Sequence, residues 1–249
     1  MIEYTKNGDL YMNIGMIGCG WLGKPLAEEL KRKYAVQCYS RSPHEDKDLD
    51  HVYLPSTNDK FWSNELFIIS ISTKDEYLSS LENFLRLIPS SSKIIFMSST
   101  SIYKGLEDRV DEESILVENT LQKQAEELVL SFNRQALILR LGGLMGEDRI
   151  AGKWKSTTPY ADGPVNYIHL EDILIIISKL IDKNILQGIY NLVAPEHPFR
   201  SSVHKNNAKM FGFEEGSYNR TTGRFVDSSK LIKVLSYDFT HPNPLEFWT

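Results

Sequence analysis

The sequence predicts an α/β fold: a doubly wound parallel sheet with helices on both faces and a small C-terminal lobe. Three observations predict it. Short apolar runs alternate with amphipathic stretches over most of the 249 residues, a pattern typical of parallel strands joined by helices. The first apolar run leads into a glycine-rich loop at 18–23, and hydroxyl residues follow a later run at 98–101. Loops of this kind gather at the carboxyl edge of a parallel sheet.

The strands are short apolar runs bounded by turn residues. They are predicted at 13–18, 35–40, 51–54, 66–72, 93–98, 136–141 and 188–192. The first helix carries Leu22, Leu26 and Leu30 on one face. Later helices are predicted at 77–87, within 112–132, at 172–181 and at 202–211. The charged stretch 44–51 lacks periodicity and is predicted to be a surface loop.

The alternation becomes looser after Leu141, so we predict a core and a lobe rather than two separate domains. The core is predicted at 12–142, completed by 166–192, and the lobe at 143–165 and 193–249. Residues 1–11 are polar and precede the first strand. They are predicted to be a flexible N-terminal extension or to precede an alternative start.

Composition is that of an ordinary globular protein, with 41% hydrophobic and 24% charged residues. The net charge of −5 disfavours nucleic acid or an anionic membrane as the main partner. The apolar runs are too short to span a membrane. The two cysteines, Cys19 and Cys38, suggest no disulfide framework and no zinc site, which is compatible with a reducing cytoplasm.

The glycine-rich loop predicts a dinucleotide site, because its G-x-G-x-x-G spacing lies between a predicted strand and a predicted helix. The first glycine permits a tight turn, the second lets the backbone approach the pyrophosphate, and the third allows close helix–strand packing. Amides at the helix N-terminus then face the phosphates. The alternative is a glycine-rich turn without a ligand. The predicted cofactor-binding residues of the loop are Gly18, Gly20, Trp21, Leu22 and Gly23.

The end of the second strand favours NADP(H) over NAD(H). NAD sites usually place an acid there for the ribose hydroxyls, whereas this chain has Ser40 and Arg41. The guanidinium of Arg41 can pair with a 2′-phosphate, or it can be a solvated loop residue. Ser70 and Ser72 end the fourth strand, where they either line the ribose side of the cofactor or cap the strand.

Further motifs follow the loop in a fixed order. They are SSTSIY at 98–103, LRLGGLMG at 139–146, YIHLED at 167–172 and YNL at 190–192. With them the chain resembles the extended and atypical short-chain dehydrogenase/reductases, the NAD(P)-dependent epimerase/dehydratase group related to nucleotide-sugar epimerases. The resemblance runs from Met12 to the C-terminus. It implies a Rossmann-type core, a C-terminal substrate lobe and a monomer or homodimer.

The resemblance also implies a catalytic set. In the family a tyrosine is the general acid/base, a lysine four residues later holds the ribose, and a hydroxyl residue holds the substrate oxygen. The match puts Ser99 in the hydroxyl position and Lys123 in the lysine position. Alternatively, Ser99 is a turn residue that hydrogen-bonds to its own backbone, and Lys123 is a surface lysine. The dehydratases carry an Asp-Glu pair after the hydroxyl, and Thr100 and Ser101 stand there instead, which argues against sugar 4,6-dehydration.

Asn119 is the departure from this pattern, because it stands where the family has its tyrosine. An amide cannot exchange a proton near neutral pH. Tyr103, after the fifth strand, is the best substitute acid, and its alternative is a packing role. Asn119 itself can be the N-cap of the next helix.

Histidine spacing matches no metal site, so we predict no metal. The resemblance gives His169 and Asp172 structural roles, in which the histidine fastens its loop to a helix and the aspartate caps or begins that helix.

Two functions therefore remain open. The first is an NADP- or NAD-dependent oxidoreductase or epimerase-like enzyme acting on a small or nucleotide-linked carbonyl or alcohol, for which Ser99, Lys123 and Tyr103 are the predicted catalytic residues. The second is a catalytically inactive sensor or regulatory protein that binds the dinucleotide, which Asn119 favours.

Overall fold

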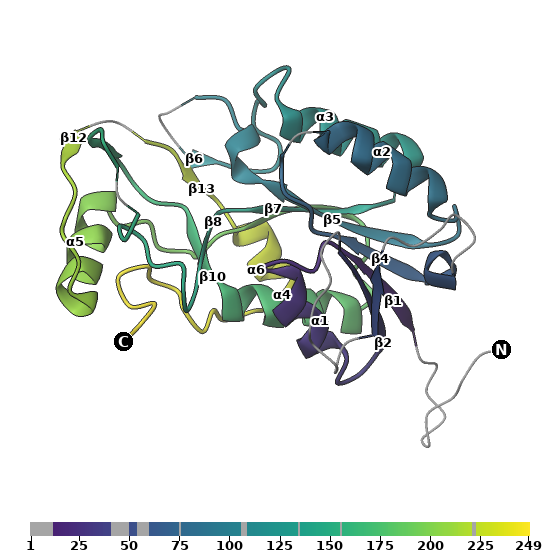
Figure 1. Cartoon of the computed structure of the whole chain (residues 1–249). Helices are drawn as coiled ribbons and strands as arrows, with labels where there is room; N and C mark the ends of the chain where they lie inside the picture. Colours follow the sequence, from purple (N-terminus) through teal and green to yellow (C-terminus); the bar gives the residue numbers. More distant parts are fainter. Residues whose placement is uncertain are drawn as a thin grey trace. The chain divides into compact units, whose positions relative to one another are not determined.

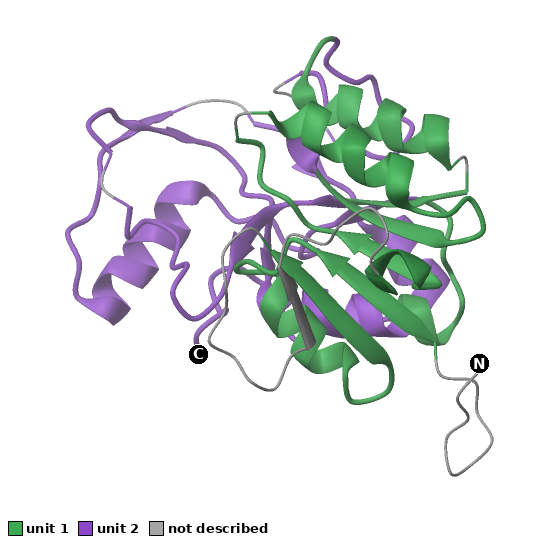
Figure 2. Ribbon diagram, turned by 45° about the vertical axis from the view of Figure 1, so that its right-hand side comes forward, with its two compact units in different colours: residues 1–98, 119–139, 180–188 green, residues 99–118, 140–179, 189–249 purple. Residues whose placement is uncertain are grey.

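The computed structural model describes residues 12–40, 50–53, 60–74, 76–105, 109–133, 135–154, 156–220 and 223–249. Two compact units divide the chain (Figure 2). Unit 1 comprises residues 1–98, 119–139 and 180–188, and unit 2 comprises 99–118, 140–179 and 189–249. Because the units are defined by compactness alone, the division into core and substrate lobe that the sequence suggested stays a prediction.

Unit 1 alternates strands and helices from its first described residues. Its elements are β1 (Asn13–Ile17), α1 (Gly23–Leu30), β2 (Ala35–Ser40), β3 (Asp50–Tyr53), the 3-10 helix η1 (Lys60–Ser63), β4 (Leu66–Ile69), α2 (Tyr77–Leu87), β5 (Lys93–Ser99) and α3 (Leu121–Phe132). In β4 all four residues are buried. A continuous apolar run of this kind is expected of a parallel strand covered on both faces.

The main sheet has seven strands in the order β11-β7-β5-β4-β1-β2-β3, where β7 is Leu137–Leu141 and β11 is Gly188–Leu192. Strand β1 pairs in parallel with β2 on one side and with β4 on the other. The strand order reverses between β1 and β4, so this is the switch point at which ligands bind in doubly wound sheets. The predicted doubly wound α/β fold is confirmed.

Helices lie on both faces of the unit 1 strands. Helix α1 packs on β1 and β2 with Leu26, Ala27 and Leu30 buried. Helices α2 and α3 lie side by side on the opposite face (Figure 1). Their buried side chains recur at helical spacing, as in the set Tyr77, Leu81 and Leu85 of α2.

Besides the residues of β7 and β11 that it contains, unit 2 is built from strands of two or three residues and from helices of varied length. They are η2 (Thr100–Ile102), β6 (Arg109–Val110), β8 (Gly143–Met145), β9 (Tyr160–Asp162), β10 (Tyr167–His169), α4 (Leu170–Asp182), α5 (Arg200–Phe211), β12 (Tyr218–Arg220), β13 (Phe225–Val226) and α6 (Ser229–Leu235). Three parallel strand pairs, β8 with β10, β9 with β12 and β6 with β13, join segments distant in sequence. Among the described residues, no helix is long and apolar enough to cross a bilayer.

Candidate dinucleotide site

Gly18 is the sharpest backbone constraint at the end of β1. Its φ is +98°, and a Cβ placed on it would lie 2.2 Å from the carbonyl oxygen of Ser70. Its backbone nitrogen donates to the carbonyl of Tyr39 at 2.9 Å. A residue with a side chain cannot occupy this position without moving β4, so the sequence has glycine where the chain leaves β1 beside the switch point.

Gly20 and Gly23 meet different constraints. A Cβ on Gly23 would lie 2.0 Å from the carbonyl oxygen of Gly18, which ties the start of α1 closely to the loop. A Cβ on Gly20 would meet none of the described atoms within 4 Å, and Gly20 is exposed. The backbone at Gly20 is therefore open to a ligand, as a pyrophosphate requires.

The start of α1 suits an anion. Leu22 occupies the N-cap position and makes no side-chain cap hydrogen bond. The first turn contains no acidic residue. The first backbone N–H groups of a helix lack partners within the helix and carry the positive end of its dipole. The loop and helix thus present amide donors where the dinucleotide phosphates were predicted.

Cys19 and Cys38 form a disulfide, although the sequence suggested no disulfide framework. Cys19 lies within the glycine loop and Cys38 in β2, and both are buried. The parallel pairing of β1 with β2 brings the two Cα atoms to 6.0 Å, which is within bridging distance. Spacing alone could not show this, because the contact depends on the register of the two strands.

The predicted cofactor residues Ser40, Ser70 and Ser72 lie at or just beyond the ends of β2 and β4. Ser40 ends β2, and Arg41 lies outside the described residues. The backbone nitrogen of Ser70 donates to the carbonyl of Ile17 at 2.8 Å, so Ser70 continues the sheet for one residue. Ser72 is exposed in the loop beyond. The predicted strand 66–72 was too long, because β4 ends at Ile69.

Ser99 ends β5 and caps the short helix η2 in unit 2. Its Oγ accepts a hydrogen bond from the backbone nitrogen of Ser101 at 3.2 Å. Its neighbour Ser98, in unit 1, is buried and donates to the carboxylate of Glu126 at 2.6 Å. Glu126 is itself buried on α3. The two adjacent serines thus have different surroundings, with Ser98 anchoring α3 and Ser99 shaping its own turn.

Tyr103 is buried at the centre of a polar network in unit 2. Its hydroxyl donates to Oδ1 of Asn191 at 2.5 Å and accepts from Nη1 of Arg140 at 3.0 Å. The guanidinium also lies over the tyrosine ring, 5.1 Å from its centroid. Burial raises the pKa of Tyr103, an effect that Arg140 and Asn191 partly oppose. The hydroxyl is thus held as a neutral hydrogen-bonding group.

The network extends beyond the residues that the sequence singled out. The backbone nitrogen of Asn191 donates to Glu112 Oε1 at 2.7 Å, and Arg140 also donates to the carbonyl of Glu112 at 3.3 Å. Arg140 is 2% exposed, a rare position for a cation without partners. An arginine inside an apolar strand run was the available signal for this network.

Arg224 supports the segment that carries Ser99 and Tyr103. Its guanidinium donates to the carbonyls of Gly105, at 2.6 Å, and Thr100, at 3.2 Å. Burial lowers its pKa. One carbonyl belongs to the first residue of η2 and the other follows η2, so Arg224 holds this part of unit 2 together.

Lys123 and Asn119 lie at the start of α3. Thr120 is the N-cap, because its hydroxyl accepts from the backbone nitrogen of Lys123 at 3.2 Å, and this corrects the suggestion that Asn119 caps the helix. Asn119 precedes the cap, is exposed and has a φ of +56°. Asparagine adopts this left-handed conformation more readily than most residues with a side chain. The Lys123 ammonium lies 3.6 Å from Glu127.

His169 and Asp172 both act at the start of α4 in unit 2. Nδ1 of His169 accepts from the backbone nitrogen of Glu171 at 3.3 Å. Burial, and next the nearby His241, lower the pKa of His169. Asp172 is buried and accepts from the Tyr237 hydroxyl at 2.6 Å, so it binds the C-terminal segment.

Known proteins include one of similar sequence and several of similar structure. No family model matches the chain. The protein YeeZ of Escherichia coli K12 is 25% identical over 93% of this chain and 97% of its own length.

Three solved structures share the fold. dTDP-glucose 4,6-dehydratase from Bacillus anthracis, solved with NAD, superposes with a TM-score of 0.76 at 13% identity, over 95% of this chain and 94% of that chain. A short-chain dehydrogenase/reductase superfamily protein from Agrobacterium tumefaciens, with bound NAD, has a TM-score of 0.71 at 14% identity, over 95% of both chains. A human epimerase family protein with NADPH has a TM-score of 0.68 at 14% identity, over 94% of this chain and 96% of that chain. The chain therefore has the fold of the NAD(P)-dependent epimerase/dehydratase and short-chain dehydrogenase/reductase proteins.

Proposed function

We propose that this chain binds NADP(H) or NAD(H) through residues 18–23 and acts as an oxidoreductase or epimerase-like enzyme. The observation that carries the proposal is the contrast among three glycines. Gly18 and Gly23 face backbone atoms at close range, whereas Gly20 faces open space at the switch point of the sheet. This combination fits a loop shaped to admit a pyrophosphate. Structures sharing the fold contain NAD or NADPH.

Different residues of unit 1 are proposed to contact different parts of the cofactor. In this proposal the backbone at Gly20 and the first amides of α1 hold the phosphates. Trp21 and Leu22 follow in the same loop, and Ser70 and Ser72 line the ribose side from the segment that follows β4. The cofactor, when bound, supplies hydride transfer, and the protein supplies position and a proton route.

NADP(H) is the preferred cofactor, because Arg41 follows β2 where an acid would favour NAD(H). Arg41→Ala is expected to weaken NADP(H) binding about tenfold or more, since a charge-assisted hydrogen bond contributes about 1.5–3 kcal/mol. NAD(H) binding should stay within about twofold of wild type. Titration calorimetry with both cofactors measures this difference.

Arg32→Ala is the matched control, because Arg32 is an exposed arginine of unit 1 that pairs with Glu29. Arg32→Ala should change neither the NADP(H) affinity nor the NAD(H) affinity. Equal losses of NADP(H) and NAD(H) affinity in Arg41→Ala would contradict the assignment of the 2′-phosphate to Arg41. A chain that binds neither cofactor would contradict the proposed function itself.

The substrate we propose is a small or nucleotide-linked carbonyl or alcohol. A structure that shares the fold is an enzyme named for dTDP-glucose. Ser99 is proposed to hold the substrate oxygen and Lys123 the ribose. Thr100 and Ser101 stand in place of the acidic pair expected of a 4,6-dehydratase, so that reaction is left out of the proposal.

For Tyr103 the observed contacts favour a positioning role over direct proton transfer. Tyr103→Phe removes the acceptor of Arg140 and the donor to Asn191, both in a buried network. The free energy of unfolding should fall by about 1–3 kcal/mol, measured by urea denaturation, with dinucleotide affinity unchanged. In Tyr34→Phe, which removes an exposed hydrogen bond to Asp182, the loss should be smaller.

Turnover distinguishes the two roles of Tyr103 once a screen of carbonyl compounds and nucleotide sugars yields a substrate. Loss of a general acid costs about 10²–10⁴ in rate. A rate loss of that size in Tyr103→Phe, with an unchanged free energy of unfolding, would make Tyr103 the proton donor instead.

A second candidate function is a dinucleotide-binding sensor without catalysis. Two observations favour it: Asn119 cannot transfer a proton, and the Tyr103 hydroxyl is already hydrogen-bonded on both sides. The chain would then bind NADP(H) or NAD(H) tightly, and no carbonyl or nucleotide sugar in the screen would be turned over. In either case we place the protein in the cytoplasm, as a monomer or homodimer.

A further inference from the structure

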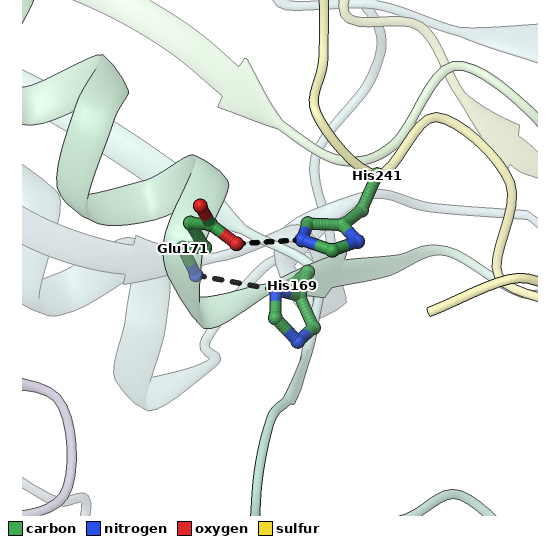
Figure 3. A group of neighbouring side chains, drawn as sticks. All are labelled: His169, Glu171 and His241. Atoms are coloured by element: carbon green, nitrogen blue, oxygen red, sulfur yellow. Dashed lines mark hydrogen bonds and ion pairs between the residues drawn. The ribbon is translucent and has the colours of Figure 1, made fainter. Parts of the chain in front are cut away.

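Three potential metal ligands meet at the start of α4, far from the glycine loop in sequence (Figure 3). His169 ends β10, Glu171 lies in the first turn of α4, and His241 comes from the C-terminal segment. One ligand atom from each residue lies within 4.8 Å of the other two. Nε2 of His241 is 2.8 Å from Glu171 Oε2, and the two imidazole centroids are 3.9 Å apart.

The backbone that carries His241 is held by Asp172. This carboxylate is fully buried and accepts hydrogen bonds from the backbone nitrogens of Thr240, at 2.8 Å, and His241, at 3.0 Å. It also accepts the hydrogen bond from Tyr237. The position of His241 against α4 is therefore fixed by an anchor that does not use its side chain.

The imidazole rings are also oriented by packing. The ring of Phe247 lies 5.5 Å from the His169 ring and 6.2 Å from the His241 ring, measured between centroids. His241 is only 19% exposed, whereas Glu171 is 54% exposed. Two held imidazoles beside one adjustable carboxylate form a partly preorganised ligand set.

We propose that His169, Glu171 and His241 bind a zinc ion that clamps the C-terminal segment to the start of α4. Two imidazoles and one carboxylate suit Zn²⁺ or a similar transition metal rather than Mg²⁺ or Ca²⁺, which take oxygen ligands. Three protein ligands leave a fourth tetrahedral position for water.

Binding of the metal requires a small movement of the three ligand atoms. Tetrahedral sites with bonds of about 2.0–2.1 Å hold their ligand atoms about 3.4 Å apart, which is closer than the 4.8 Å limit here. Glu171 Oε2 is already 2.8 Å from Nε2 of His241, so the closure has to bring His169 nearer to these two groups, while the exposed Glu171 side chain can adjust to the metal. Coordination through Nδ1 of His169 would replace the long 3.3 Å hydrogen bond from the Glu171 backbone.

The experiment uses the full chain without a histidine tag, stripped with a chelator and then dialysed. Titration calorimetry with Zn²⁺ should show one site with a dissociation constant in the micromolar range or below. Co²⁺ should bind at the same site and give the visible absorption of a tetrahedral centre. Zn²⁺ should also raise the thermal unfolding temperature, because it binds the folded state.

Glu171→Gln and His241→Gln should each weaken Zn²⁺ binding at least tenfold and abolish the Co²⁺ spectrum. His197→Gln is the matched control, since His197 contacts the carbonyl of Val165 outside the cluster and should leave both readouts unchanged. Absence of a one-to-one site in the wild type would overturn the proposal. So would equal Zn²⁺ affinity in Glu171→Gln, a surface variant expected to fold.

Discussion

Replacing Gly20 by valine is expected to abolish dinucleotide binding while the protein stays folded. The Cβ of the new side chain would enter space that is free of described protein atoms, so no clash with the described part of the fold is expected. It would occupy the proposed pyrophosphate position. Loss of two charge-assisted hydrogen bonds, at about 1.5 kcal/mol or more each, weakens binding about a hundredfold or more. Fluorescence titration with NADPH measures the affinity, and circular dichroism checks the fold.

Gly18→Val is the matched comparison, and it should lose dinucleotide binding because the fold itself is destabilised. Its Cβ would collide with the Ser70 backbone, and its φ of +98° is unsuited to a side chain. Destabilisation is therefore expected at position 18, whereas position 20 should lose only binding. Retention of wild-type NADPH affinity by Gly20→Val would show that the loop is not the phosphate site.

Breaking the Cys19–Cys38 disulfide is expected to lower the free energy of unfolding by about 3 kcal/mol, the value for a closed loop of roughly 15–20 residues. Urea denaturation with and without a phosphine reductant measures the change. The double variant Cys19→Ala/Cys38→Ala should be insensitive to reductant, which separates the disulfide from other effects of reduction.

Thiol counting gives an independent check on the same bond. Protein purified without reductant and then denatured should expose no free thiol. Two free thiols per chain would contradict the disulfide. Because cytosolic disulfides are uncommon and usually transient or redox-sensing, the extent of oxidation in the cell also tests the proposed cytoplasmic location.

The local elements were the part of the fold most accessible from sequence. Strand 35–40 and helix 77–87 match β2 and α2 to the residue, because apolar periodicity and flanking turn residues mark them clearly. The strand pairs β6 with β13 and β9 with β12 were not predicted. Their two- and three-residue strands carry no period and depend on partners more than fifty residues away.

In the candidate site, too, the local features could be predicted from the sequence and the long-range contacts could not. The glycine loop is local, so its spacing predicts both its place and its constraints. By contrast, the Tyr103 network and the His169–Glu171–His241 cluster depend on contacts across 37 to 88 residues of sequence. The disulfide was missed because it follows from the register of β1 against β2. Pairings of this kind are set by tertiary structure and leave no period to detect.

The backbone at Asn119 bears on how this chain can evolve. A point mutation of its codon can introduce tyrosine, the residue that stands at this position in the family that the chain resembles. In the left-handed conformation that Asn119 adopts, however, tyrosine would carry a strain of about 1–2 kcal/mol. Its ring would also start from the turn before α3 rather than from the helix. Asn119→Tyr alone is therefore expected to destabilise the turn and to leave the phenol outside the helix, so a proton donor carried by α3 would also require α3 to begin earlier in the chain.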